Sequence, residues 1–212
     1  MTRTRAWTRR HFALLAGATC LPWPARANAL PEEGFEYEVL ATPVATASPG
    51  RIEVLEFFRY GCPFCDRLEP LLQAWKARLP ADVAFRYVPV SFHSTTHQQL
   101  FLTLQLLGEE TRLRARVYDA IHRERQHLEI LMEISAWAQG HGVAPERFEA
   151  AWHAPEVQAG LAQANTLVQG YGVTSVPQFG VNGRYRTSPA MVGGSNARAL
   201  QVVDHLVTLA RG

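Results

Sequence analysis

Two cysteines stand three positions apart in this chain, Cys62 and Cys65, within the segment EFFRYGCPFCDRLEP at residues 56–70. A pair of thiols at this spacing suits three kinds of chemistry. It can cycle between dithiol and disulfide, it can supply half of the ligands of a metal ion, or it can form a disulfide that only holds the chain together. Which of the three applies depends on the element that carries the pair.

A helical pattern begins at the first cysteine. Apolar residues recur after it at spacings of three and four, at Phe64, Leu68, Leu71, Leu72, Trp75 and Leu79. A thiol at a helix N-terminus faces unpaired backbone N–H groups and the positive end of the helix dipole, which favour the thiolate. Pro63 fits the first helical turn, where its missing N–H costs nothing. We predict that Cys62 forms a mixed disulfide with a partner and that Cys65, buried one turn further on, resolves it.

A metal site and a structural disulfide are the alternatives. A metal site needs further ligands, and the chain has no second C-x-x-C pair. His93 and His97 follow the strand expected at residues 83–90, so a Cys₂His₂ site stays open, although each histidine alone fits a surface loop better. A disulfide over so short a loop stabilises a fold little. We expect a redox-active disulfide between Cys62 and Cys65, without metal or organic cofactor.

The elements around the pair predict an α/β domain with helices inserted in its middle. The expected elements are strands at 36–40 and 51–58, a helix from Cys62 that ends at Pro80, a strand at 83–90, helices over 93–169, strands at 178–181 and 184–185, and a helix at 196–210. A strand–helix–strand unit places two parallel strands in one sheet. We expect residues 30–92 and 170–212 to form the α/β domain and residues 93–169 to form an inserted helical domain.

A second signal lies near the C-terminal end, in GYGVTSVPQFGVNGRY at residues 170–185. Val176 and Pro177 directly precede a predicted strand, and an X-Pro bond in such a turn can be cis. A cis bond would expose the backbone of Val176, which could then pair with an extended peptide by strand addition. The alternative is a trans proline that merely begins an edge strand.

The first 29 residues have the pattern of an export signal. Arginines without any acid precede an apolar segment, and Ala27-Asn28-Ala29 fits a cleavage site after Ala29. The adjacent Arg9 and Arg10 are typical of twin-arginine export, and an ordinary signal is the alternative. Cleavage would remove Cys20, five of the 21 basic residues and none of the 19 acidic ones. The mature chain would be slightly acidic, so its charge predicts no nucleic-acid partner.

Together these segments resemble the thioredoxin superfamily, and within it the DsbA branch of bacterial periplasmic disulfide oxidases. The matching stretches are VLEFFRYGCPFCDRLEP, AFRYVPVSF and GVTSVPQFGVNGRY, in family order, with FEAAW at residues 148–152 in the insertion. The resemblance implies a thioredoxin-like fold with an inserted all-helical domain. It also implies that Val176-Pro177 is a cis-proline loop facing Cys62.

The resemblance further implies a buried acid and base beneath the thiols, and Glu56, Glu69 and Arg86 match these positions. A carboxylate near Cys65 can relay its proton while the mixed disulfide resolves. Arginine keeps its proton, so Arg86 could only hold the carboxylates in place. An ordinary salt bridge at a strand edge is the alternative.

The sequence departs from the family between the cysteines, where Phe64 stands in place of the histidine of the strongly oxidising members. Phenylalanine can neither donate a hydrogen bond to a thiolate nor stabilise it by charge. We therefore expect Cys62 to be more acidic than a free cysteine but less acidic than in those relatives, which would make a milder oxidant.

The resulting hypothesis is a periplasmic, monomeric protein-disulfide oxidoreductase that introduces disulfides into unfolded exported proteins. A membrane oxidase of the DsbB type would reoxidise it, and an apolar surface around Phe64 and Val176 would hold both partners. Three alternatives stay open: a reductase or isomerase of the same fold, a metal carrier using Cys62, Cys65 and His93, and a peptide-binding chaperone with an incidental disulfide.

Overall fold

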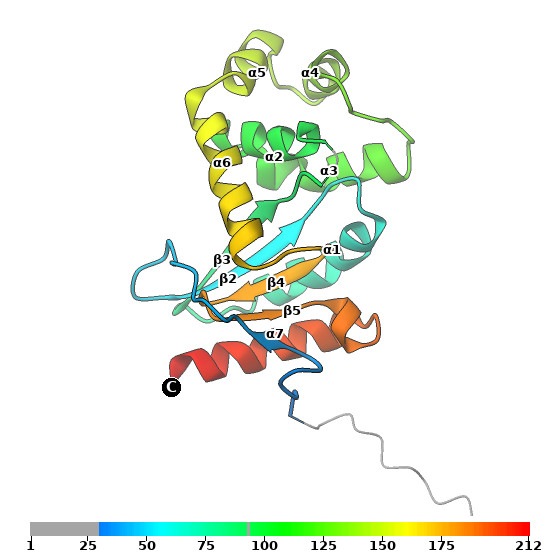
Figure 1. The fold of residues 1–212 in the computed structure, drawn as a ribbon. Helices are drawn as coiled ribbons and strands as arrows, with labels where there is room; N and C mark the ends of the chain where they lie inside the picture. The colour runs from blue at the N-terminus through cyan, green and yellow to red at the C-terminus, as the bar shows by residue number, and fades with distance from the viewer. Residues whose placement is uncertain (1–29, 93) are drawn as a thin grey trace, which may run out of the picture.

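The computed structural model describes residues 30–92 and 94–212, and a five-stranded mixed sheet lies at its centre (Figure 1). The sheet order is β1-β5-β4-β2-β3. The strands are β1 (Glu38–Val39), β2 (Ile52–Phe58), β3 (Val83–Pro89), β4 (Gln178–Val181) and β5 (Tyr185–Thr187). β3 pairs parallel with β2, and β4 pairs antiparallel with β2 on its other side. The predicted signal segment, residues 1–29, lies outside the described residues, as does His93.

Helices cover both faces of the sheet (Figure 1). On one face, α1 (Pro63–Lys76) and α7 (Asn196–Arg211) share a core with Val54 of β2. On the other face, α6 (Pro155–Gly170) shares a core with Leu55 of the same strand. Every residue of β2 is buried, because successive side chains point into the two opposite layers.

Within the part of the chain that the structure describes, five helices lie between β3 and β4, where the sequence predicts an insertion. They are α2 (Thr96–Leu106), α3 (Glu110–His122), α4 (Leu131–Gly140), α5 (Pro145–Trp152) and α6. The core of α2 to α5 includes Leu100, Val117 and Phe148, and it extends to Phe58 at the end of β2 and to Cys65 in α1. Helices α2 to α5 therefore share a core with the buried thiol. The fold is thioredoxin-like, with a helical insertion between β3 and β4 (Figure 1).

The structure differs from the sequence prediction at a few element ends. α1 ends at Lys76 instead of continuing to Pro80. The last turn tightens there, since the N–H groups of Arg78 and Leu79 bond to carbonyl groups three residues back. A short 3₁₀ helix, η1 (Pro189–Val192), was not predicted, because four residues carry no readable periodicity. No helix within residues 30–92 and 94–212 is long and apolar enough to cross a membrane.

Candidate active site

Cys62 is the N-cap residue of α1, and Pro63 follows it in the first turn. Both Cys62 and Cys65 are free thiols in this structure, so the site is in its reduced form. A hydrogen bond from Cys65, helped by backbone N–H groups at the helix start, lowers the pKa of Cys62 to about 6 against the opposing effect of partial burial. The stabilisation of the Cys62 thiolate thus comes first from Cys65, and the backbone groups at the helix start, on which the prediction rested, add to it.

Cys65 lies one helical turn deeper and is fully buried. Burial raises the pKa of its thiol well above the ordinary value, and the hydrogen bond to Cys62 and the charge of Glu56 add to this. The two sulfurs therefore differ in character. Cys62 is partly exposed and acidic, whereas Cys65 is sheltered and holds its proton. Such a pair can form a bond to an outside partner at one sulfur and release it with the other.

The loop before β4 meets the thiols from the other end of the chain. The peptide bond between Val176 and Pro177 is cis, as the resemblance implied. The Cys62 thiol donates a hydrogen bond to the Val176 carbonyl oxygen, with a sulfur–oxygen distance of 3.4 Å. The two segments that the sequence singled out therefore form one site.

Glu56 and Glu69 lie together beneath the thiols, where the sequence placed them. Glu56 is fully buried, and neither of its oxygens accepts a hydrogen bond from the residues that the structure describes. Burial raises its pKa to about 8, although the nearby charge of Arg114 opposes this shift. Glu69 is also buried and accepts a hydrogen bond of 2.9 Å from Arg114 Nε. A carboxyl group that titrates near neutral pH can both give and take a proton.

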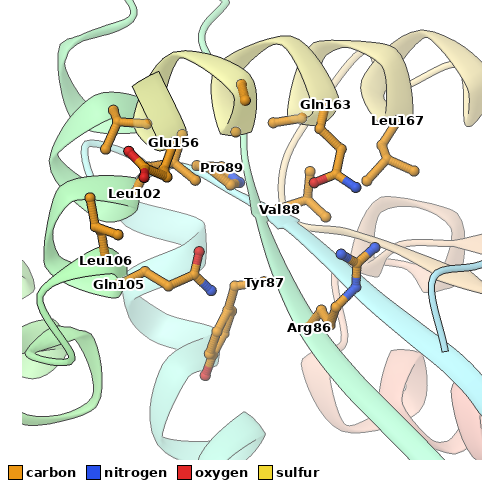
Figure 2. Close-up of a pocket in the computed structure, with 14 residues that line it drawn as sticks. Arg86, Tyr87, Val88, Pro89, Leu102, Gln105, Leu106, Glu156, Gln163 and Leu167 are labelled. Atoms are coloured by element: carbon orange, nitrogen blue, oxygen red, sulfur yellow. The ribbon is translucent and has the colours of Figure 1, made fainter. Parts of the chain in front are cut away.

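The prediction that Arg86 is the buried base beneath the thiols is wrong. Its Nε lies 3.1 Å from Glu53, and the side chain lines a cavity of about 720 Å³ between β3, α2 and α6 (Figure 2). Side chains alternate along a strand, so Arg86 and Tyr87 point to opposite sides of β3 (Figure 2). In the pairing of β2 with β3, Glu56 lies beside Tyr87 and Leu55 lies beside Arg86. Arg86 therefore belongs to the face of the sheet opposite to Glu56. Arg86 therefore cannot reach the carboxylates under the thiols.

The base in that place is Arg114 of α3, which the sequence analysis missed. Its Nη2 lies 3.5 Å from Glu56, its Nη1 lies 3.2 Å from Glu110, and the whole side chain is buried. The segment TRLRARVYDAIH contains three arginines, and nothing in the sequence distinguishes the buried Arg114 from the exposed Arg112 and Arg116. Only the packing of α3 against the sheet and α1 reveals it.

Three further polar groups near the thiols were also missed. Lys76 Nζ lies 2.9 Å from the Tyr87 hydroxyl, and that hydroxyl lies 3.5 Å from Glu69 Oε1. His122, the last residue of α3, bonds through Nε2 to the Tyr60 carbonyl oxygen at 2.7 Å, and its charge contributes to the lowered pKa of Cys62. The helical insertion thus supplies a histidine beside the thiol, although Phe64 occupies the position between the cysteines.

Two histidines were considered as metal ligands, and the structure describes one of them, His97. This histidine is not a surface residue. His97 is buried at the start of α2, and its Nε2 lies 3.4 Å from the His127 carbonyl oxygen and 3.9 Å from Glu129. A Cβ atom at Gly61 would come within 3.3 Å of its ring, so a glycine allows the strand–helix turn to pass this close. Among residues 30–92 and 94–212, no three histidine, cysteine or acidic side chains are grouped as metal ligands.

A mainly apolar pocket of about 290 Å³ adjoins the thiols. Its lining includes Phe64, Val176 and Pro177 together with Pro189 and Ala190 of η1. Phe64 itself is 60% exposed. The site therefore presents an acidic thiol, the backbone of Val176 and an apolar surface side by side.

Comparisons with known proteins agree with this geometry. A family model described as DSBA-like thioredoxin domain matches residues 72–203. The thiol:disulfide interchange protein DsbA of Azotobacter vinelandii is 38% identical over 201 residues, covering 92% of this chain and 94% of the relative. The same comparison with DsbA of Pseudomonas aeruginosa gives 36% identity over 197 residues, with 92% of each chain covered.

Solved structures lead to the same result. The crystal structure of Pseudomonas aeruginosa DsbA superposes with a TM-score of 0.82 at 37% identity, covering 85% of this chain and 95% of that one. DsbA from Xylella fastidiosa gives a TM-score of 0.80 at 31% identity, with 86% and 99% covered. The chain therefore belongs to the family of DsbA-like thioredoxin domains and is a thiol:disulfide oxidoreductase.

Proposed function

We propose that this oxidoreductase introduces disulfides into unfolded exported proteins by exchange at Cys62 and Cys65. The observation that carries the proposal is the contrast between the two thiols. A partly exposed sulfur with a pKa of about 6 sits over a buried sulfur with a raised pKa. The relatives that carry the name thiol:disulfide interchange protein support it.

The reaction begins with the oxidised pair. A substrate thiolate attacks Cys62 Sγ, the bond to Cys65 breaks, and Cys65 leaves as a thiolate that takes a proton from Glu56. A second substrate thiolate then attacks the substrate sulfur of the mixed disulfide. Cys62 leaves as a thiolate, the substrate keeps the new disulfide, and two electrons remain on the enzyme as the reduced pair.

The acidity of Cys62 favours this direction over reduction. A stabilised thiolate lowers the free energy of the reduced form, so the enzyme gives its disulfide away more readily. This is the reason to prefer an oxidase to a reductase or isomerase of the same fold.

The surface beside Cys62 fits an extended polypeptide. The backbone at Val176 can pair with a substrate strand, and the apolar pocket along Phe64 and Pro177 can take one of its side chains. We infer that the same surface meets a membrane oxidase of the DsbB type, which would return the pair to the disulfide. The exchange itself needs neither metal nor organic cofactor.

The signal pattern and the proposed chemistry both favour a periplasmic site of action. The segment before residue 30 has the pattern of a signal cleaved after Ala29, and disulfide formation belongs to an oxidising compartment. We propose that the mature protein works there as a monomer. Native mass spectrometry of the purified mature protein should give the monomer mass without stoichiometric zinc or copper, and a metal-bound species would favour the carrier alternative.

The direct experiment is to trap the mixed disulfide with Cys65→Ala in a cell that exports the protein. Without the second sulfur, the intermediate on Cys62 should accumulate and carry cysteine-containing exported proteins. Cys62→Ser with Cys65→Ala is the matched control and should trap nothing. Alkylation of the wild-type protein in the same cells should show the pair mainly oxidised. A mainly reduced pair would point to the reductase, and trapping without Cys62 would refute the proposed chemistry.

A further inference from the structure

One arginine joins the helical insertion to the acids beneath the thiols. Arg114 lies on α3, whereas Glu56 lies on β2 and Glu69 lies on α1. Its Nε donates a hydrogen bond to Glu69 at 2.9 Å, its Nη1 donates one to Glu110 at 3.2 Å, and its Nη2 lies 3.5 Å from Glu56. Through this side chain α3 contacts an acid on each of the other two elements.

The guanidinium group is also fixed by aromatic rings. Its Cζ lies 3.5 Å from the ring centroid of Tyr87 and 4.2 Å from that of Phe58. With 2% of the residue exposed, the group cannot turn toward solvent without disrupting this packing. Two of its nitrogens are held by hydrogen bonds to other acids, which leaves Nη2 facing Glu56 with no hydrogen-bond partner among the described residues.

The charges of the cluster do not balance if every acid is ionised. Its carboxyl groups are Glu56, Glu69 and Glu110, and its bases are Arg114 and Lys76, so one retained proton makes it neutral. Glu56 is where that proton fits, because it is the fully buried acid without a hydrogen bond. A buried carboxylate without hydrogen bonds is costly, and only the opposite charge beside it makes ionisation accessible.

We propose that Arg114 is a positioning residue for disulfide exchange: it sets how firmly Glu56 holds its proton, and thereby how readily Cys65 can give up or regain its own. This inference rests on the proposed function. In the resolving step, the Glu56 carboxylate takes the proton of Cys65, and Cys65 attacks Cys62 Sγ. The bond between Cys62 and the partner breaks, and the partner sulfur leaves as a thiolate with the electron pair. In the opposite direction Glu56 returns the proton to Cys65.

The groups that face this proton come from every element packed around it. From α1 and the residue that caps it they are Cys62, Cys65, Glu69 and Lys76, and from α3 they are Arg114, which also binds Glu110, and Tyr118. Tyr87 of β3 completes the set, while Tyr60 before α1 faces Arg114, and burial raises the pKa of both phenols. Those phenols are therefore neutral across the working range. Arg114 is the close positive charge, and Lys76 adds a weaker one.

The test compares Arg114→Met/Glu110→Gln with Glu110→Gln alone. The double variant loses one positive and one negative charge, so it keeps the net charge of the cluster and should fold. Reduced protein is mixed with oxidised glutathione, and decay of the mixed disulfide on Cys62 is followed by quenching and mass spectrometry at pH values on both sides of 8. The protonated Glu56 carboxyl is titrated in parallel by its infrared band, which is assigned by its loss in Glu56→Gln.

In the wild type we expect the decay rate of the mixed disulfide and the infrared band of Glu56 both to show an inflection near pH 8. In the double variant they should move upward together by ~1 unit or more relative to Glu110→Gln, the size expected for losing an opposite charge at this distance. Arg114→Lys should move them less. Arg116→Met, an exposed arginine on the same helix, should leave them in place.

A folded double variant whose inflections coincide with those of Glu110→Gln would overturn the proposal. So would a resolving rate whose pH profile is the same in Glu56→Gln as in the wild type. If the wild type forms no mixed disulfide at all, the proposed function fails. The infrared titration would then still decide whether Arg114 sets the proton affinity of Glu56.

Discussion

The Cys62 thiol donates its hydrogen bond to the carbonyl oxygen of Val176, a residue 114 positions later in the chain, at 3.4 Å. The reactive sulfur is therefore held between two independent segments, the start of α1 and the loop before β4. A change in either segment should act on the sulfur directly.

A negative charge at position 176 should suppress the thiolate. In Val176→Asp a carboxylate would stand beside Cys62, and like charges at such distances raise a pKa by ~1 unit or more. The ultraviolet absorbance of the thiolate, titrated in the reduced protein, measures the shift. Val176→Asn has nearly the same shape without the charge and should move the pKa much less. Equal shifts in both variants would mean that packing, not charge, connects the loop to the sulfur.

The pH dependence of the wild type should follow the same thiol. With a pKa of about 6, Cys62 is mostly ionised at neutral pH, whereas a free cysteine with a pKa of about 8.5 is not. The rate of reaction with a small disulfide should therefore rise through pH 6 and then level off. Cys65→Ala removes the hydrogen bond that lowers the pKa most, so its profile should shift toward higher pH. A wild-type inflection close to the free-thiol value would contradict the activation by α1.

The residues of the site were predictable where the signal is local. A C-x-x-C pair at a helix start and a Val-Pro before a strand are both visible in the sequence, and their chemistry follows from short-range geometry. The strands that carry them follow from runs of β-branched and aromatic residues. The contact between Cys62 and Val176 was not visible in this way. It came from the resemblance to a family, because no pattern in a sequence measures a distance across 114 positions.

The base under the thiols shows where sequence reasoning fails. Arg86 and Tyr87 are neighbours, and choosing between them requires the register of β3 against β2, which pairs Glu56 with Tyr87. A shift of one residue reverses the two faces of a strand. Arg114 was harder still, since its partners lie on two other elements. His97 was expected at the surface, and its burial depends on how α2 packs against the turn at Gly61.

Replacing Phe64 by histidine should make the enzyme a stronger oxidant. Phe64 is exposed beside the thiol and carries the Arg67 guanidinium 4.5 Å from its ring centroid. A histidine there could donate a hydrogen bond to the Cys62 thiolate and stabilise the reduced form. Each unit by which the Cys62 pKa falls corresponds to ~30 mV in the potential of this two-electron couple. Equilibration with glutathione measures the change.

Phe64→Leu is the control for that experiment. It keeps an apolar side chain while removing the ring, so its potential should stay close to that of the wild type. A histidine variant with an unchanged potential would show that His122 and the helix start already provide the stabilisation that the histidine would add.

Glu56 should make the reduced protein less stable as the pH rises. Its pKa is raised to about 8 in the folded state and lies near 4.3 in an unfolded chain. Between these values the folded state keeps a proton that the unfolded state has lost, so the free energy of unfolding falls with increasing pH by up to ~1.4 kcal/mol per unit. Below about pH 4 both states are protonated and the penalty vanishes.

Glu56→Gln keeps the shape of the neutral acid and cannot ionise, while Arg114 retains Glu69 and Glu110. Denaturant unfolding should therefore show the variant more stable than the wild type at pH 8 and no different at pH 4. Glu146→Gln removes an exposed acid and should show no such trend. If Glu56→Gln were less stable than the wild type at pH 8, Glu56 would have to be ionised and well paired in the folded state, and it could not serve Cys65 as a proton donor.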